Sequence, residues 1–205
     1  MAKMKSPRGK LVRKFGENIF GNPKFDKLLN RKPYASGQHG QTRRRRLSNY
    51  GLQLKEKQKI KTMYGVLERQ FRNYFEKADK MTGETGTNLM QILECRLDNV
   101  TYRLGFAPTR PAARQLVNHA HVIVNNQKVN IPSFIVKPGD VIQIRSRSKK
   151  LDFILDSMKR IKGDLDLAWL ELDKAKMTGT IIAVPDREDM QVLVNEQLVV
   201  ELYSK

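Results

Sequence analysis

Cysteine is almost absent from this 205-residue chain, which holds only Cys95. One thiol makes no intramolecular disulfide and no multi-cysteine metal site, so we expect neither. Aromatic residues are also scarce, at 7%. No apolar run approaches the roughly 20 residues of a membrane-spanning helix. The first ten residues carry cations without an apolar stretch, which argues against a secretory signal. We therefore expect a cytoplasmic location and no membrane partner.

Acidic residues are also few. The chain has 21 Asp and Glu against 39 Lys and Arg, which gives a net charge of +18. The excess lies toward the front. Residues 1–93 hold 22 basic and 7 acidic residues, residues 94–150 hold 10 and 3, and residues 151–205 hold 7 and 11. A chain with this charge repels itself until a polyanion neutralises it. The distribution predicts that residues 1–150 bind nucleic acid.

Residues 1–47, rich in Gly and Pro, are expected to form a basic extended arm with short ordered pieces. The arm ends in the run Arg43–Arg46, directly after the loop-like stretch 36–42. A solvated, disordered run is the alternative interpretation. Arginine binds phosphate with two parallel donors, so we predict that this run contacts a nucleic-acid backbone.

Helical patterns follow the arm. Ser48 is a predicted N-cap for a helix to about 64, and a second helix is predicted for 66–81. Thr87 is predicted to cap one continuous helix that ends near Gly105. A short helix should begin at Thr109.

From residue 121 onward the apolar period shortens, which predicts strands. The expected strands lie at 122–124, 129–131 and 141–145. The expected turns between them lie at 125–126 and 138–140. Beyond them we predict a helix at 151–162 and strands near 169–172, 179–185 and 198–202. The fold class predicted is α+β, with a basic arm and helical domain followed by two short helices packed on a small antiparallel sheet.

Two rows of hydrogen-bond donors stand out between residues 94 and 118. Arg96, Asn99 and Arg103 are spaced i, i+3 and i+7, so they share a face if they lie on one helix. Arg110 and Arg114 are spaced i, i+4 on the next helix. The spacing predicts two parallel rows of guanidinium donors.

Surface ion pairs are the alternative interpretation of these arginines. Such pairs need acids, and residues 94–150 contain only Glu94, Asp98 and Asp140. Gln115 and Asn118, beside the second row, could contact sugar hydroxyls or base edges. The mixture favours RNA over duplex DNA as the ligand.

His119 and His121 lie two residues apart, a spacing that puts them on one face of a strand. Two nitrogens fall short of the three or four ligands of a stable metal site. We therefore predict hydrogen bonds to phosphate or packing for this pair, with no metal and no cofactor.

Residues 93–107 (LECRLDNVTYRLGFA) and 109–119 (TRPAARQLVNH) resemble the two helices of the S4 RNA-binding module, and residues 124–140 resemble its sheet. The module also occurs in pseudouridine synthases, a tRNA synthetase and heat-shock RNA binders, so alone it indicates only RNA. Flanking stretches resemble the S4 family of small-subunit ribosomal proteins, so the likeness covers nearly the whole chain. They are residues 37–40, 47–59, 64–72, 169–170, 176–180 and 195–205.

Three positions depart from the family pattern. Ser36 stands where a proline is frequent, Ala120 where many members have glycine between the two histidines, and Asn126 where glycine is common. Asparagine tolerates positive φ, so the turn at 125–126 should survive. The N-terminal cysteine cluster that binds zinc in some relatives is missing, so zinc is not carried over.

The resemblance implies a structural, non-enzymatic protein that binds the 5′ region of small-subunit (16S-type) rRNA and nucleates early assembly of the 30S subunit. Its implied neighbours are small-subunit ribosomal proteins three and five, and mRNA where it enters the subunit. The implied domains are the arm at 1–47, a helical domain at 48–93 completed by about 190–205, the module at 94–157 and a C-terminal α+β segment at 158–205.

The predicted RNA-binding residues combine the cationic and amide side chains above with the matching family positions. They are Arg43, Arg44, Arg45, Arg46, Tyr50, Lys55, Lys59, Arg69, Arg72, Arg96, Asn99, Arg103, Thr109, Arg110, Arg114, Gln115, Asn118, His119, His121 and Asn125. An RNA-modifying enzyme is one alternative, but it needs a catalytic domain for which the chain has no room after residue 150. An RNA chaperone or ribosome-rescue factor using the same module is the other.

Overall fold

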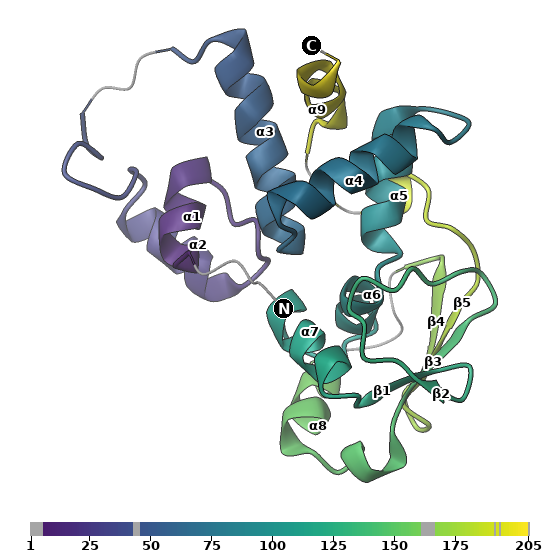
Figure 1. Ribbon diagram of the computed structural model, residues 1–205. Coiled ribbons are helices and arrows are strands. Elements are labelled where there is room, and N and C mark those ends of the chain that lie inside the picture. The colour runs from purple at the N-terminus through teal and green to yellow at the C-terminus, as the bar shows by residue number, and fades with distance from the viewer. Residues whose placement is uncertain (1–5, 43–45, 161–166, 191, 193, 205) are drawn as a thin grey trace. The chain divides into compact units, whose positions relative to one another are not determined.

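The structure is a computed structural model that describes residues 6–42, 46–160, 167–190, 192 and 194–204. The chain forms two compact units (Figure 1). The first comprises Met1–Asn73 and Leu193–Lys205, and the second comprises Tyr74–Val192. Helices together with one antiparallel sheet confirm the predicted α+β class. Among the described residues, no helix combines the length and the apolar character needed to cross a bilayer.

The first unit is helical. It holds α1 (Arg8–Phe15), α2 (Pro23–Arg31), α3 (Asn49–Tyr64), the start of α4 (Glu68–Asp79), and α9 (Glu196–Tyr203). The predicted cap of α3 is confirmed, because the Ser48 hydroxyl accepts from the Gly51 amide. Gly65, at φ 62°, ends the helix in the left-handed conformation that glycine adopts without steric cost.

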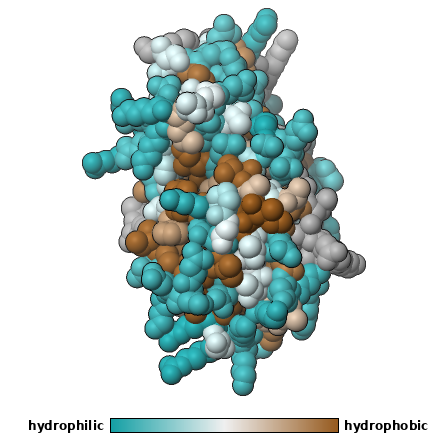
Figure 2. Space-filling view, turned by 90° about the vertical axis from the view of Figure 1, so that its right-hand side faces the viewer, coloured by the Kyte–Doolittle hydropathy of each residue, from teal (hydrophilic) through white to brown (hydrophobic). Residues whose placement is uncertain are grey.

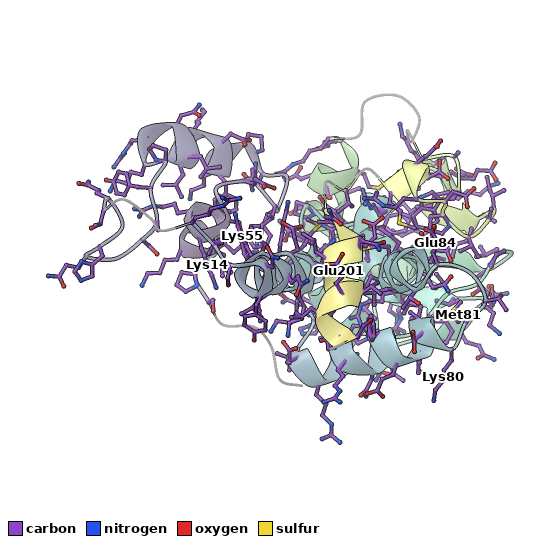
Figure 3. All side chains as sticks on the ribbon, turned by 90° about the horizontal axis from the view of Figure 1, so that it is seen from above. Lys14, Lys55, Lys80, Met81, Glu84 and Glu201 are labelled. Carbon is purple, nitrogen blue, oxygen red and sulfur yellow. The ribbon has the colours of Figure 1, made fainter. Side chains whose placement is uncertain are left out.

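The strand predicted at 198–202 is wrong, because these residues belong to α9. The Asn195 side chain accepts from the Leu198 amide and caps the helix. Val199 is fully buried, and α9, on which Figure 3 labels Glu201, packs against α3. The Gln53 amide of α3 donates to Glu201 at 2.8 Å. β-Branched residues favour strands locally, but the cap and the packing against α3 outweigh that preference.

Glu68 connects α4 with α3 and α9. Its carboxylate accepts from Lys57 at 2.6 Å, from Lys61 at 2.7 Å and from the Tyr203 hydroxyl at 3.2 Å. Partial burial acts to raise the pKa of Glu68, but the two lysines outweigh it and lower the pKa from 4.5 to about 2. The folded state therefore favours the ionised carboxylate.

A pH-dependent contribution to stability follows. A lowered carboxyl pKa stabilises the fold above the unfolded value of 4.5, and that contribution is lost as the pH falls toward 2. Glu68→Gln should lower the free energy of unfolding by about 1 kcal/mol or less above pH 5, because the side chain is half exposed and screened. Urea titrations followed by circular dichroism should show this difference shrinking below pH 4.5. A difference that grows on acidification would contradict the assignment.

The second unit contains the sheet and most of the shorter helices. Besides the end of α4, its helices are α5 (Thr85–Glu94), α6 (Leu97–Arg103), α7 (Arg110–Asn118) and α8 (Asp152–Met158), with 3-10 turns η1 (Ser146–Ser148) and η2 (Glu188–Met190). Its strands are β1 (Val122–Val124), β2 (Gln127–Lys128), β3 (Val141–Ile144), β4 (Leu170–Asp173) and β5 (Thr178–Ile181).

The sheet is antiparallel in the order β2-β1-β3-β5-β4. The hairpin between β1 and β2 turns at Asn125 (φ 47°) and Asn126 (φ 64°), as predicted for these two asparagines. β5 lies beside β3 and brings Gly179 against the core residue Leu104. A Cβ at Gly179 would lie 2.4 Å from a Leu104 methyl carbon. β5 can therefore pack this closely only with glycine at position 179. The C-terminal segment thereby extends the sheet.

The continuous helix predicted from Thr87 to Gly105 is wrong, because it is two helices broken at Cys95 and Arg96. Arg96 is extended (φ −70°, ψ 136°), and the Leu97 and Asp98 amides donate to the carbonyls of Phe134 and Pro132. These long-range bonds replace the helical ones. The predicted cap is also displaced, since α5 begins at Thr85 with Glu84 at its N-cap position.

Candidate nucleic-acid interface

Two buried carboxylates lie at the junction of α5, α6 and α7. Glu94 is fully buried and Asp98 is 2% exposed. Buried carboxylates are costly unless charge-assisted hydrogen bonds satisfy them. Every arginine of the two predicted rows points to this junction, so the junction determines where their guanidiniums lie.

Asp98 binds two arginines. Its Oδ1 accepts from Arg96 Nε at 3.0 Å, and its Oδ2 accepts from Arg96 Nη2 at 2.8 Å and from Arg114 Nε at 2.7 Å. Arg96 also donates to the Tyr74 hydroxyl from α4. Burial acts to lower the pKa of Arg96, but Asp98 and Tyr74 outweigh it and raise the pKa above its usual value. Arg96 is therefore held permanently charged inside the unit.

Glu94 organises the other donors. Arg103 makes a two-point contact with it, Nε to Oε2 at 3.0 Å and Nη2 to Oε1 at 2.8 Å, and also donates to the Met190 carbonyl. The Asn99 amide donates to Glu94 Oε2 at 2.7 Å. The Asn99 oxygen accepts from Arg110 Nε at 2.7 Å. Arg110 thus contacts the carboxylate through Asn99.

The structure corrects the expectation of two open rows of donors. Arg96 and Asn99 are each 2% exposed, and Arg96 precedes α6 instead of lying on it. Arg103 and Arg114 keep 13% and 19% of their side chains exposed. The few acids of this segment are enough to pair with these arginines, because each of two carboxylates serves two of them, directly or through Asn99.

The exposed face of α7 is polar. Its N-cap is the predicted one, because the Thr109 hydroxyl accepts from the Ala112 amide. Ala113, Leu116 and Val117 are buried, whereas Gln115, Asn118 and His119 are exposed. Gln115, Asn118 and the partly exposed arginines lie on α7, and His119 is its C-cap. This face offers amide, imidazole and guanidinium groups to a ligand.

A second group of cations lies next to that face. His121 Nδ1 is 2.8 Å from the Ser148 hydroxyl, and the Arg145 amide donates to the His121 carbonyl. Burial, together with His119 and Arg145, lowers the pKa of His121, which favours its neutral form. The cations that this turn adds are Arg145, Arg147, Lys149 and Lys150. We did not predict them as binding residues, although the sequence RSRSKK at 145–150 is a clear basic signal.

Asn125 is bound within the unit. Its amide donates to Asp140 at 2.8 Å, and its oxygen accepts from the Val141 amide at 2.9 Å. These bonds join the β1–β2 turn to the turn before β3. The structure therefore shows a structural role for Asn125.

Comparison with known proteins decides the family. Residues 3–94 match the "Ribosomal protein S4/S9 N-terminal domain" and residues 95–142 match the "S4 domain". The chain is 52% identical to the "Small ribosomal subunit protein uS4" of Chlorobaculum tepidum and 53% identical to those of Parabacteroides distasonis and Bacteroides fragilis, each over 100% of both chains. The chain belongs to the uS4 family. It is a structural ribosomal protein of the cytoplasm and contains an S4 RNA-binding domain.

The match to the S4 domain begins at Cys95, where the structure of this uS4 protein breaks the helix. Burial and the charge of Glu94 raise the pKa of the Cys95 thiol to about 12. The described residues contain no group of three or more His, Cys, Asp or Glu placed to hold a metal ion. Cys95 therefore lies in the core as a small apolar residue.

In the first unit of this uS4 protein, the predicted RNA-binding residues differ in exposure. Arg43, Arg44 and Arg45 lie outside the described residues, whereas Arg46, Tyr50, Arg69 and Arg72 are exposed and Lys55 is half-buried. Lys59 is 5% exposed and pairs with Glu17 at 2.5 Å. Lys59 therefore fixes the segment after α1 to α3, which is a structural role.

Ala120 separates the two histidines in a strained conformation. Its φ of 56° lies in the left-handed region, where a Cβ costs roughly 1–2 kcal/mol. Ala120→Gly should therefore raise the free energy of unfolding by about 1 kcal/mol. Urea unfolding followed by the fluorescence of Trp169, the only tryptophan, measures it. The control Ala112→Gly, within α7, should lower stability by about as much. If both variants lost the same free energy of unfolding, the assignment of strain to Ala120 would be wrong.

Proposed function

We propose that this uS4 protein binds small-subunit rRNA directly, as a structural component without catalytic activity. The observation that carries the proposal is the α7 face. Gln115, Asn118 and His119 are exposed there beside two partly exposed, fixed arginines. Guanidiniums position phosphates, and amides contact 2′-hydroxyls and base edges. The cations at 145–150 extend this surface along the next turn.

The first unit, which includes the arm at 1–47, supplies a second set of contacts in this proposal. Arg46, Arg69 and Arg72 are exposed. The S4 module alone also serves unrelated RNA binders, so the full-length likeness to uS4 proteins is what supports ribosomal RNA over RNA in general. Figure 2 shows one face of the protein on which hydrophilic side chains lie around exposed hydrophobic ones.

The finer proposal concerns place and timing. We propose that the protein binds the 5′ region of the rRNA early and nucleates assembly of the small subunit. Its neighbours would be small-subunit ribosomal proteins three and five, with mRNA passing nearby as it enters. We propose the domain boundaries 48–93 and 94–157, which the junction of the two family matches at 94 and 95 supports, although the compact units divide at 73 and 74. The packing of α9 on α3 supports completion of the helical domain by the C-terminal residues.

Crosslinking in cells, followed by sequencing of the attached RNA, tests the proposal. We expect reads concentrated in the 5′ region of small-subunit rRNA, and co-sedimentation with intact small subunits. Accumulation on free large subunits would instead support a ribosome-rescue factor. Reads spread over many messengers would support an RNA chaperone.

A further inference from the structure

Asn99 lies where an asparagine can connect a carboxylate to a guanidinium. Its Nδ2 donates to Glu94 Oε2 at 2.7 Å and to the Glu94 carbonyl at 3.0 Å, and its Oδ1 accepts from Arg110 Nε at 2.7 Å. A flipped amide would face Nδ2 toward a donor and Oδ1 toward a carboxylate. The amide therefore has one orientation. With 2% exposure, water does not compete for these bonds.

Arg110 is consequently held from two sides. Its Nε is bound by Asn99, and its guanidinium lies over the Tyr102 ring at 4.8 Å. Glu94, which orients Asn99, also fixes Arg103 by a two-point contact. The directions of Arg110 and Arg103 are therefore set by the same fully buried carboxylate.

We infer that Asn99 is a positioning residue for RNA selectivity, because it fixes the direction in which Arg110 meets a phosphate. This inference rests on the proposed binding of rRNA. An arginine on a flexible side chain follows any phosphate and adds affinity for every RNA alike. A fixed guanidinium favours only an RNA whose phosphate lies where it points, and it loses less side-chain freedom on binding. Asn99 thus acts through Arg110 without touching RNA.

Asn99→Leu removes the connection and keeps a similar volume. Arg110 is left partly exposed, so it can turn to solvent without becoming a buried unpaired charge. Filter binding should compare a folded transcript of the 5′ region of small-subunit rRNA with a scrambled transcript of the same length. We expect affinity for the folded transcript to fall about tenfold, the effect of one charge-assisted bond, with affinity for the scrambled transcript unchanged.

Arg110→Lys tests the same idea at a position less critical for folding. Lysine keeps the charge but lacks the planar fork. The ratio of the two affinities should again fall about tenfold. Lys159→Ala, an exposed cation of the C-terminal segment, is the matched control and should leave the ratio unchanged.

A double-mutant cycle separates positioning from general stability. In an Arg110→Ala background, Asn99→Leu should change the ratio less than about twofold, since the guanidinium that Asn99 positions is gone and Arg103 keeps its own two-point contact with Glu94. The inference is overturned if Asn99→Leu lowers both affinities together, if it acts equally without Arg110, or if both single variants keep the wild-type ratio. If the wild-type protein itself does not prefer the folded transcript, the proposed function fails instead.

Discussion

Replacing Asp98 by Ala is expected to lower the free energy of unfolding of the second unit by about 3–5 kcal/mol. Arg96, with 3% of its side chain exposed, would lose its carboxylate and remain as an uncompensated buried charge. Arg114 would lose the same partner. Trp169, which is 2% exposed in that unit, reports the transition by fluorescence in urea.

Asp156→Ala is the control for this experiment. Asp156 pairs with Lys159 at 3.4 Å, but 66% of its side chain is exposed. Exposed pairs contribute about 0–1 kcal/mol, so this variant should unfold close to the wild type. If Asp98→Ala also unfolded within 1 kcal/mol of the wild type, the network would be dispensable for stability.

Affinity for the folded 5′-region transcript is expected to fall by about 1,000-fold or more between 50 and 200 mM salt. Replacing Arg43–Arg46 by Ala should weaken binding and flatten the log–log salt dependence by roughly three units, because up to four phosphate contacts disappear. The choice of these four arginines rests on the sequence, because the structure describes only Arg46 among them. Filter-binding titrations at several salt concentrations measure both effects.

A matched variant removes the same charge elsewhere. This variant replaces four basic residues of segment 151–205, where acids outnumber bases, by Ala. The four are Lys159, Arg160, Lys174 and Lys176. This variant should keep the steep slope. Equal flattening by both variants would show that total charge, and not the arm, sets the affinity.

Local chemistry was predictable from the sequence at several positions where a side chain acts within a few residues. The caps at Ser48 and Thr109 and the positive φ of Asn125 and Asn126 follow from side chains that bond or tolerate their own backbone. The break at Cys95 was not predictable in this way. It depends on carbonyls of residues 132–134, which are far along the chain.

The candidate site was predictable in residue type but not in geometry. The sequence supplies the arginines and amides, whereas their burial depends on how α5, α6 and α7 meet. Counting acids along the chain underestimated Glu94 and Asp98, because one carboxylate has four lone-pair sites and serves several donors. The basic turn at 145–150 was visible in the sequence, but only its position beside His121 connects it to α7.

The packing of α9 on α3 affects the order in which a newly synthesised chain can fold. About 130 residues separate the two helices, and the whole second unit is translated between them. The second unit can therefore fold while the side of α3 that α9 will cover, which includes Gln53, is still open. The first unit is completed only after α9 has been made, so its folding ends with the last residues of the chain.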